Sequence, residues 1–355
     1  IKKAFDFHSK GNIHEAAKYY QYFIDKGFKD HIVFSNYGTI LKSFGKLKEA
    51  EIFARKAINI NSNFAEAHSN LASILVDLGK LDEAEISQRE AIEIEPNSSL
   101  FYFNLGNIMR DKGNLEKAES YFRKAIKIEP GFENAYFNLG IILKDLESIE
   151  EAEKAFRTAI KINPNSANAH YNLGNLQKEL DNIQEAEISF RKAISIKSDF
   201  PEAHNNLGII LKDLGKLEEA ENSYREAIRY KNNYYEAYFN LSFKELLIGD
   251  YEAGLKHYEL RENIKSVHAS PKIKRINSLN LKMQEKLLVV SEQGLGDTLQ
   301  YMRYIPYLKK MGLDISFCAQ EKLHSLIKAS DIDSRPLTPD QANNISKGHW
   351  IPLLS

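Results

Sequence analysis

Apolar and small residues recur along most of the chain with a period of 34 residues. Within each period, apolar positions lie three and four residues apart in two successive stretches, which is the spacing of two amphipathic helices. The clearest unit spans residues 65–98, and later units begin at Ser99, Glu133, Ala167, Pro201 and Tyr235. An earlier unit begins at His31, and a partial unit precedes it. This period predicts a repeat architecture in which neighbouring units stack on each other.

Small residues mark the places where the two helices of a unit must approach closely. Positions are numbered here from the first residue of each unit, and the eighth holds Gly38, Ala72, Gly106, Gly140, Gly174, Gly208 and Ser242. Bulky side chains fill the space beside them, and these are Phe122, Phe156, Phe190, Tyr224 and Tyr258 at position 24. Glycines such as Gly79, Gly113 and Gly215 lie between the two stretches, where a helix must end and the chain must turn.

These positions resemble the tetratricopeptide repeat (TPR) motif, and the resemblance covers residues 1–268. It implies an all-α fold, a right-handed superhelix of antiparallel helix pairs. About eight repeats are expected, the first partial and the last degenerate, with Gly254 replacing an alanine. The resemblance also implies that positions 2, 5, 6, 9, 12 and 13 of each first helix line a concave groove. We therefore expect a scaffold that binds other proteins.

An asparagine occupies position 6 in seven units: Asn36, Asn70, Asn104, Asn138, Asn172, Asn206 and Asn240. An amide has donors and an acceptor, so it can pair with the backbone of an extended peptide. Packed helices lie about 8–10 Å apart and an extended chain advances about 3.3 Å per residue, so one asparagine would serve about every third peptide residue. The row resembles the asparagine ladder in the TPR superhelix of O-linked N-acetylglucosamine transferases. The alternative is that asparagine is merely common at this position in such repeats.

Aromatic and charged side chains accompany the asparagines. Position 5 holds Phe103, Phe137 and Tyr171, and position 12 holds Lys144, Lys178 and Lys212, each followed by an acidic residue. Lysine and acid are adjacent in sequence and need not pair, so a solvated charged face is the simpler interpretation. His68, His170 and His204 lie one repeat apart and are expected to pack, so no metal site is predicted.

The 34-residue period ends after residue 268, and the pattern becomes that of an α/β protein. Residues 269–285 contain a proline and scattered basic residues, which predicts a linker. Residues 286–355 alternate between apolar runs and helical stretches, with strands expected at 287–291, 313–320 and 349–354. Helices are expected from about Thr298, with a kink at Pro306, and over 321–330. This order predicts a small, incomplete Rossmann-like α/β domain with a parallel sheet.

Residues 292–312 resemble the start of bacterial heptosyltransferase-like glycosyltransferases of the GT-B fold. The resemblance implies that Asp297, beside a turn made by Gly294 and Gly296, is a general base acting on the acceptor hydroxyl. The alternative is that Asp297 caps the helix after it. A GT-B enzyme needs a second domain to hold the sugar nucleotide. We therefore expect this chain to be inactive alone and without a cofactor. A longer parent would use a UDP-sugar to transfer a hexosyl or N-acetylglucosaminyl group.

The composition of the chain reduces the number of functional classes to which it could belong. The charged residues nearly balance, with a net charge of −1, which argues against a general nucleic-acid binder. A single cysteine, Cys318, excludes an intramolecular disulfide and suits the cytoplasm. No apolar run of about 18 residues is present, so no membrane span is expected. The chain begins at Ile1, and we expect the true N-terminus to be missing. Peptide binding, glycosyl transfer in a longer parent and self-association remain as functions.

Overall fold

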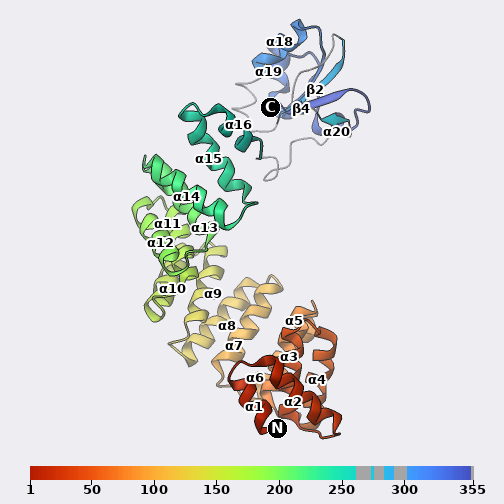
Figure 1. Cartoon of the computed structure of the whole chain (residues 1–355), viewed down its shortest axis with the longest axis vertical. Coiled ribbons are helices and arrows are strands. Elements are labelled where there is room, and N and C mark those ends of the chain that lie inside the picture. Colours follow the sequence, from red (N-terminus) through yellow and green to blue (C-terminus); the bar gives the residue numbers. More distant parts are fainter. Residues whose placement is uncertain (261–272, 276–283, 292–301, 353–355) are drawn as a thin grey trace. The chain divides into compact units, whose positions relative to one another are not determined.

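The computed structural model describes residues 1–260, 273–275, 284–291 and 302–352 (Figure 1). The chain divides into two compact units, Ile1–Ser198 and Asp199–Ser355, and each is described by itself. The boundary lies near the end of the 34-residue repeat that begins at Ala167, two residues before the repeat is complete. The 34-residue period alone does not predict it.

The unit Ile1–Ser198 consists of six helix pairs that follow one another along the chain. The pairs are α1 (Lys2–Ser9) with α2 (Ile13–Asp25), α3 (His31–Ser43) with α4 (Leu47–Ile60), α5 (Ala65–Asp77) with α6 (Leu81–Ile94), α7 (Ser99–Asp111) with α8 (Leu115–Ile128), α9 (Glu133–Asp145) with α10 (Ile149–Ile162), and α11 (Ala167–Glu179) with α12 (Ile183–Ile196). From α3 onward, each first helix begins at the residue where the sequence places the start of a unit. The predicted helix-pair solenoid is therefore confirmed, while the handedness of its superhelix stays a prediction.

The second unit continues the same period and ends in a sheet. Its helix pairs are α13 (Pro201–Asp213) with α14 (Leu217–Tyr230) and α15 (Tyr235–Leu247) with α16 (Tyr251–Glu259). Its later elements are β1 (Lys274–Arg275), β2 (Lys286–Val290), a 3₁₀ turn (Met302–Tyr304), α18 (Ile305–Lys310), β3 (Asp314–Cys318), a 3₁₀ turn (Glu321–Leu323), α19 (His324–Ala329), α20 (Pro339–Asn343) and β4 (His349–Pro352). None of the described helices is long and apolar enough to cross a bilayer.

Aromatic rings packed on glycines join the two helices of a repeat. The rings of Phe122, Phe156, Phe190 and Tyr224 are almost completely buried. Each lies against the glycine at position 8 of the preceding helix: a Cβ added to Gly140 would lie 2.7 Å from Phe156 Cε1. The backbone approach thus depends on the absence of a side chain, as the pattern of small residues predicts.

The turn between the helices of a repeat requires a left-handed residue at position 15. Gly79, Gly113 and Gly215 there have φ of 74°, 76° and 74°. Glu147 and Asp181 take the same place in two other repeats, both with φ of 59°. Because a side chain disfavours this backbone conformation, these two turns are less favourable than their glycine counterparts.

The C-terminal sheet has four parallel strands in the order β1-β4-β2-β3. Its apolar side chains form clusters on both faces, one around Leu287 and Phe317 and the other around Leu288 and Trp350. The predicted parallel α/β arrangement is therefore confirmed, whereas its assignment as Rossmann-like stays a prediction. Burial raises the pKa of Cys318 in β3 to about 12, so this thiol stays protonated and unreactive near neutral pH.

Two details of this region differ from the sequence prediction. Pro306 lies in the first turn of α18, where a backbone N–H would have no partner within the helix, so its absence in proline costs no hydrogen bond. In the described residues, Pro306 does not kink a longer helix. Strand β1 falls inside the predicted linker, where it pairs Lys274 with His349 and Arg275 with Trp350. A strand of two residues is too short to leave a periodic signal in the sequence.

Candidate functional site

Within each of the two compact units, the first helices of the repeats form one face, here called the first-helix face. It carries positions 2, 5, 6, 9, 12 and 13 of each unit. Successive first helices pack directly on each other, because α3 contacts α5, α5 contacts α7, and α13 contacts α15. Side chains of adjacent repeats therefore meet on this face, and the predicted asparagine row lies along it.

The asparagine amides make hydrogen bonds between repeats. Asn70 Nδ2 donates to Ser35 Oγ at 2.9 Å, and Asn104 Nδ2 donates to Ser69 Oγ at 3.2 Å. Asn138 Nδ2 donates to Asn107 Oδ1 at 2.9 Å. Asn240 Nδ2 likewise reaches Asn205 Oδ1 at 3.0 Å, within the second unit. The row thus has a structural role that the sequence prediction did not include.

The remaining asparagines behave differently. Asn36 Nδ2 lies 3.5 Å from the Tyr20 hydroxyl, and Asn172 Nδ2 donates to the Asn168 carbonyl of its own helix at 2.9 Å. All seven side chains, Asn206 included, are half-buried. In the described part of the chain, no hydrogen bond reaches Oδ1 of Asn70, Asn104 or Asn138. These three amides therefore keep an acceptor, and one of two N–H donors, for a ligand.

The position-5 aromatics lie on the same face and rest on the core. Phe137 packs on Phe156 at 6.1 Å between ring centroids, and Tyr171 packs on Phe190 at 5.9 Å. Phe103 lies between Phe122 and Phe132, at 5.7 Å and 4.9 Å. Each position-5 ring is half-buried, so it is held rigidly and still presents an edge at the surface.

Charged residues of this face form ion pairs between repeats. A lysine at position 12 can pair with an acid of the next repeat, even where, as for Lys144, another acid follows it directly in sequence. Lys42 Nζ lies 3.3 Å from Asp77, and Lys144 Nζ lies 2.6 Å from Glu179; each pair joins position 12 of one repeat to position 13 of the next. Lys212 lies 3.6 Å from its neighbour Asp213. Lys178 forms no ion pair in the part of the chain that the structure describes. The predicted solvated face is in part an inter-repeat ladder of charges.

A pocket of about 130 Å³ opens on the first-helix face between α5 and α7. Its lining is mostly polar and includes Asn104, Ser73 and the carboxylates of Asp77 and Asp111. At its base lies Gln88 of α6, at position 24, where later repeats have an aromatic ring. The pocket was not predicted from the sequence, although a glutamine at position 24 in place of an aromatic residue could have indicated it.

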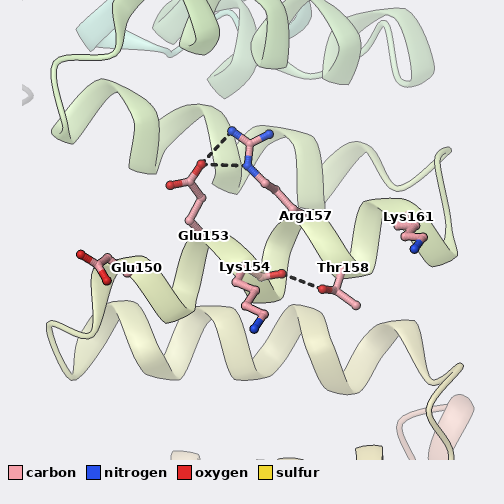
Figure 2. Close-up of a pocket in the computed structure, with 6 residues that line it drawn as sticks. All are labelled: Glu150, Glu153, Lys154, Arg157, Thr158 and Lys161. Atoms are coloured by element: carbon pink, nitrogen blue, oxygen red, sulfur yellow. Dashed lines mark hydrogen bonds and ion pairs between the residues drawn. The ribbon is translucent and has the colours of Figure 1, made fainter.

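The opposite face has a different character. An open depression of about 410 Å³ lies over α10, and Figure 2 shows that its charged side chains lie along this one helix. Arg157 donates to Glu153 at 2.8 Å in the same helix and to Glu185 of the next repeat at 3.0 Å. Because the depression is lined by one helix and Arg157, one of its three cations, is already paired, it is a weaker candidate for a binding site than the first-helix face.

Ion pairs of this kind recur along the second helices. Lys80 of the next repeat, together with Arg55, holds the pKa of Glu51 below its usual range. Lys112 does the same to the pKa of Glu85. These carboxylates therefore stay ionised near neutral pH and link consecutive repeats on the side away from the asparagines.

The predicted residues of the glycosyltransferase-like stretch, Asp297, Gly294 and Gly296, lie outside the described residues. In sequence they follow Ser291, which is fully buried at the carboxyl end of β2.

Comparisons with known proteins agree with the helix pairs. Models of the tetratricopeptide repeat match residues 33–64, 63–129, 142–181, 167–200 and 201–234, together more than half of the chain. None of the curated proteins matches the chain.

Two solved structures are similar in fold. The Cut9–Hcn1 heterotetramer of the APC/C matches with a TM-score of 0.56 and 17% identity, over 68% of this chain and 48% of that chain. PilF of Pseudomonas aeruginosa matches with a TM-score of 0.52 and 17% identity, over 56% of this chain and 91% of that chain. At this identity the likeness concerns the fold alone.

Proposed function

The chain belongs to the tetratricopeptide repeat family, whose members mediate contacts between proteins, and from this premise we propose that its first-helix face holds an extended segment of a partner protein. The observation that carries the proposal is the row of asparagines with an acceptor left over. In Asn70, Asn104 and Asn138 the Nδ2 group is fixed by the preceding repeat, so Oδ1 has a defined direction. A row of fixed acceptors suits the backbone N–H groups of an extended chain.

Rigid neighbours support this role. Phe103, Phe137 and Tyr171 rest on buried rings, so they offer apolar contacts to a bound segment with little loss of side-chain entropy. The Lys144–Glu179 pair crosses from one repeat to the next and keeps the first helices in register. Recognition would then depend on the peptide backbone at the asparagines and on peptide side chains between them.

We expect the combined substitution of Asn70, Asn104 and Asn138 by alanine to weaken binding of extended peptides on the order of a hundredfold. The reason is that each lost hydrogen bond contributes about 1 kcal/mol, and about 1.4 kcal/mol corresponds to a tenfold change in affinity. Fluorescence anisotropy with peptides selected from a random library would measure the change.

The matched control replaces Asn63, Asn97 and Asn165, which are exposed in loops after the second helices. Circular dichroism would establish that both triple variants keep their helical content. Equal affinity of the wild type and the first-helix variant for the selected peptides would refute the role of the asparagines.

A second proposal concerns the C-terminal sheet. Its four strands are parallel in the order β1-β4-β2-β3, and in open parallel sheets ligands bind outside the carboxyl ends of the strands. Asp297 follows the end of β2 in sequence, so this order supports a sugar-nucleotide site there in a longer parent protein. The repeat models end at residue 234, and the proposal therefore rests on the sheet and on the sequence resemblance. Failure of the natural-length protein to bind any UDP-sugar would exclude it.

A further inference from the structure

The pocket between α5 and α7 lies where two features of the repeat are interrupted at once. Position 24 holds Gln88 in place of the ring found as Phe122 and Phe156 in the next repeats. Position 12 holds Val76 in place of the cation found as Lys42 and Arg110 on either side. Both residues line the pocket. The combination of Gln88 with Val76 distinguishes this repeat from the other complete repeats.

The base of the pocket is a fixed polar network. Gln88 is completely buried; its Nε2 donates to the Phe101 carbonyl and its Oε1 accepts from Ser69 Oγ, both at 3.1 Å. Ser69, 6% exposed, in turn accepts from Asn104 Nδ2 at 3.2 Å. This chain of hydrogen bonds uses the amide nitrogen of Asn104, so its Oδ1 is left as an acceptor at the pocket.

The lining contains two carboxylates, and Lys42 of the preceding repeat donates to Ser73 Oγ beside them. Asp77 and Asp111 belong to the lining, and no lysine or arginine does. Lys42 reaches Asp77 from the preceding repeat, but Val76 offers Asp111 no equivalent partner. Among the residues that the structure describes, Asp111 forms an ion pair only with its sequence neighbour Arg110, at 3.0 Å, on the exposed surface. Such an exposed pair contributes little and can be exchanged for a ligand cation.

We propose that this pocket receives a basic side chain of the bound partner segment, an inference that rests on the proposed peptide-binding function. The cation would meet the carboxylates of Asp77 and Asp111 and the free oxygen of Asn104. The volume of 130 Å³ is well above the roughly 10–15 Å³ that one water molecule needs, so the end of a long side chain can enter. It is well below the roughly 300–1,000 Å³ of sites for small-molecule ligands, so a nucleotide or sugar ring does not fit.

The test compares matched peptides that bind the wild-type chain and carry lysine, acetyl-lysine or norleucine at each position in turn. At one position, lysine is expected to bind at least tenfold more tightly than acetyl-lysine or norleucine. The double variant Asp77→Asn with Asp111→Asn should abolish this preference, so that the lysine and norleucine peptides bind with similar affinity. Asp145→Asn, at the same position of the next repeat and outside the pocket lining, should keep the preference.

A second variant fills the pocket from below without altering charge. Gln88→Phe combined with Ala72→Gly copies the ring and glycine of the next repeat, Phe122 and Gly106. It should lower the affinity for the lysine peptide to that for the norleucine peptide. If peptides bind but lysine is preferred nowhere, or if the preference survives in both variants, the subsite is wrong and the peptide-binding function stands. If no library peptide binds the wild type, both are wrong.

Discussion

Gly140→Val is expected to lower the free energy of unfolding of the helix stack by about 2–3 kcal/mol. The Cβ alone would lie 2.7 Å from Cε1 and 2.8 Å from Cδ1 of Phe156, whose ring is fully buried and cannot turn aside. Valine adds two further methyl groups to that contact. Its helix propensity exceeds that of glycine by only about a few tenths of a kcal/mol, which does not offset the overpacking. Urea unfolding followed by circular dichroism measures the loss.

Two further variants assign this loss to the ring contact. Gly131→Val adds a side chain where no atom lies within 4 Å of the new Cβ, and it should change stability by less than about 0.5 kcal/mol. Phe156→Ala removes the ring, and Gly140→Val should cost less in that background than in the wild type. Strict additivity of Gly140→Val and Phe156→Ala would show that the glycine is not required by the ring.

His257→Ala is expected to destabilise the pair α15 and α16 by about 3 kcal/mol. Glu245 is 2% exposed, and its Oε2 lies 2.7 Å from His257 Nδ1. Among the described residues, the nearest cation to Glu245 is then Arg225, at 3.6 Å and half-exposed. A carboxylate that loses its closest partner in a buried site keeps its desolvation cost without the compensating attraction. Hydrogen exchange of the amides in α15 and α16 measures the effect locally.

The repeat itself supplies the compensating change. Position 11, occupied by Glu245, holds leucine in four other repeats: Leu41, Leu75, Leu143 and Leu211. Adding Glu245→Leu to His257→Ala should therefore restore most of the lost protection, because an apolar residue fits this buried position. If the double variant exchanges as fast as His257→Ala alone, the buried carboxylate is not the cause of the instability.

The helices could be predicted from the sequence because their determinants are local and repeated. The spacing of Leu105, Gly106 and Phe122 recurs in the next three repeats, with tyrosine in place of phenylalanine in the third. The two-residue strand β1 and the five-residue helix α20 carry no such repetition, and they were not predicted. The division of the chain after Ser198 has no signal in the period either.

The candidate site could be predicted only in part. The sequence placed the asparagines on one face because that depends on helical periodicity alone. The partners of their amides, Ser35, Ser69 and Asn107, lie 31 or 35 residues away in sequence and come within reach only through the stacking of repeats. Lys144 and Glu179 pair for the same reason, whereas the sequence indicated only that a lysine need not pair with the acid beside it.

The most direct test of the central claim, that the asparagine oxygens hold a peptide backbone, is the affinity of peptides methylated at single backbone nitrogens. Methylation removes one N–H donor and leaves every peptide side chain in place. With fixed acceptors about one repeat apart, affinity should fall at least tenfold at about every third residue and stay nearly unchanged at the residues between. Equal effects at all positions, or none at any, would contradict backbone recognition by Asn70, Asn104 and Asn138.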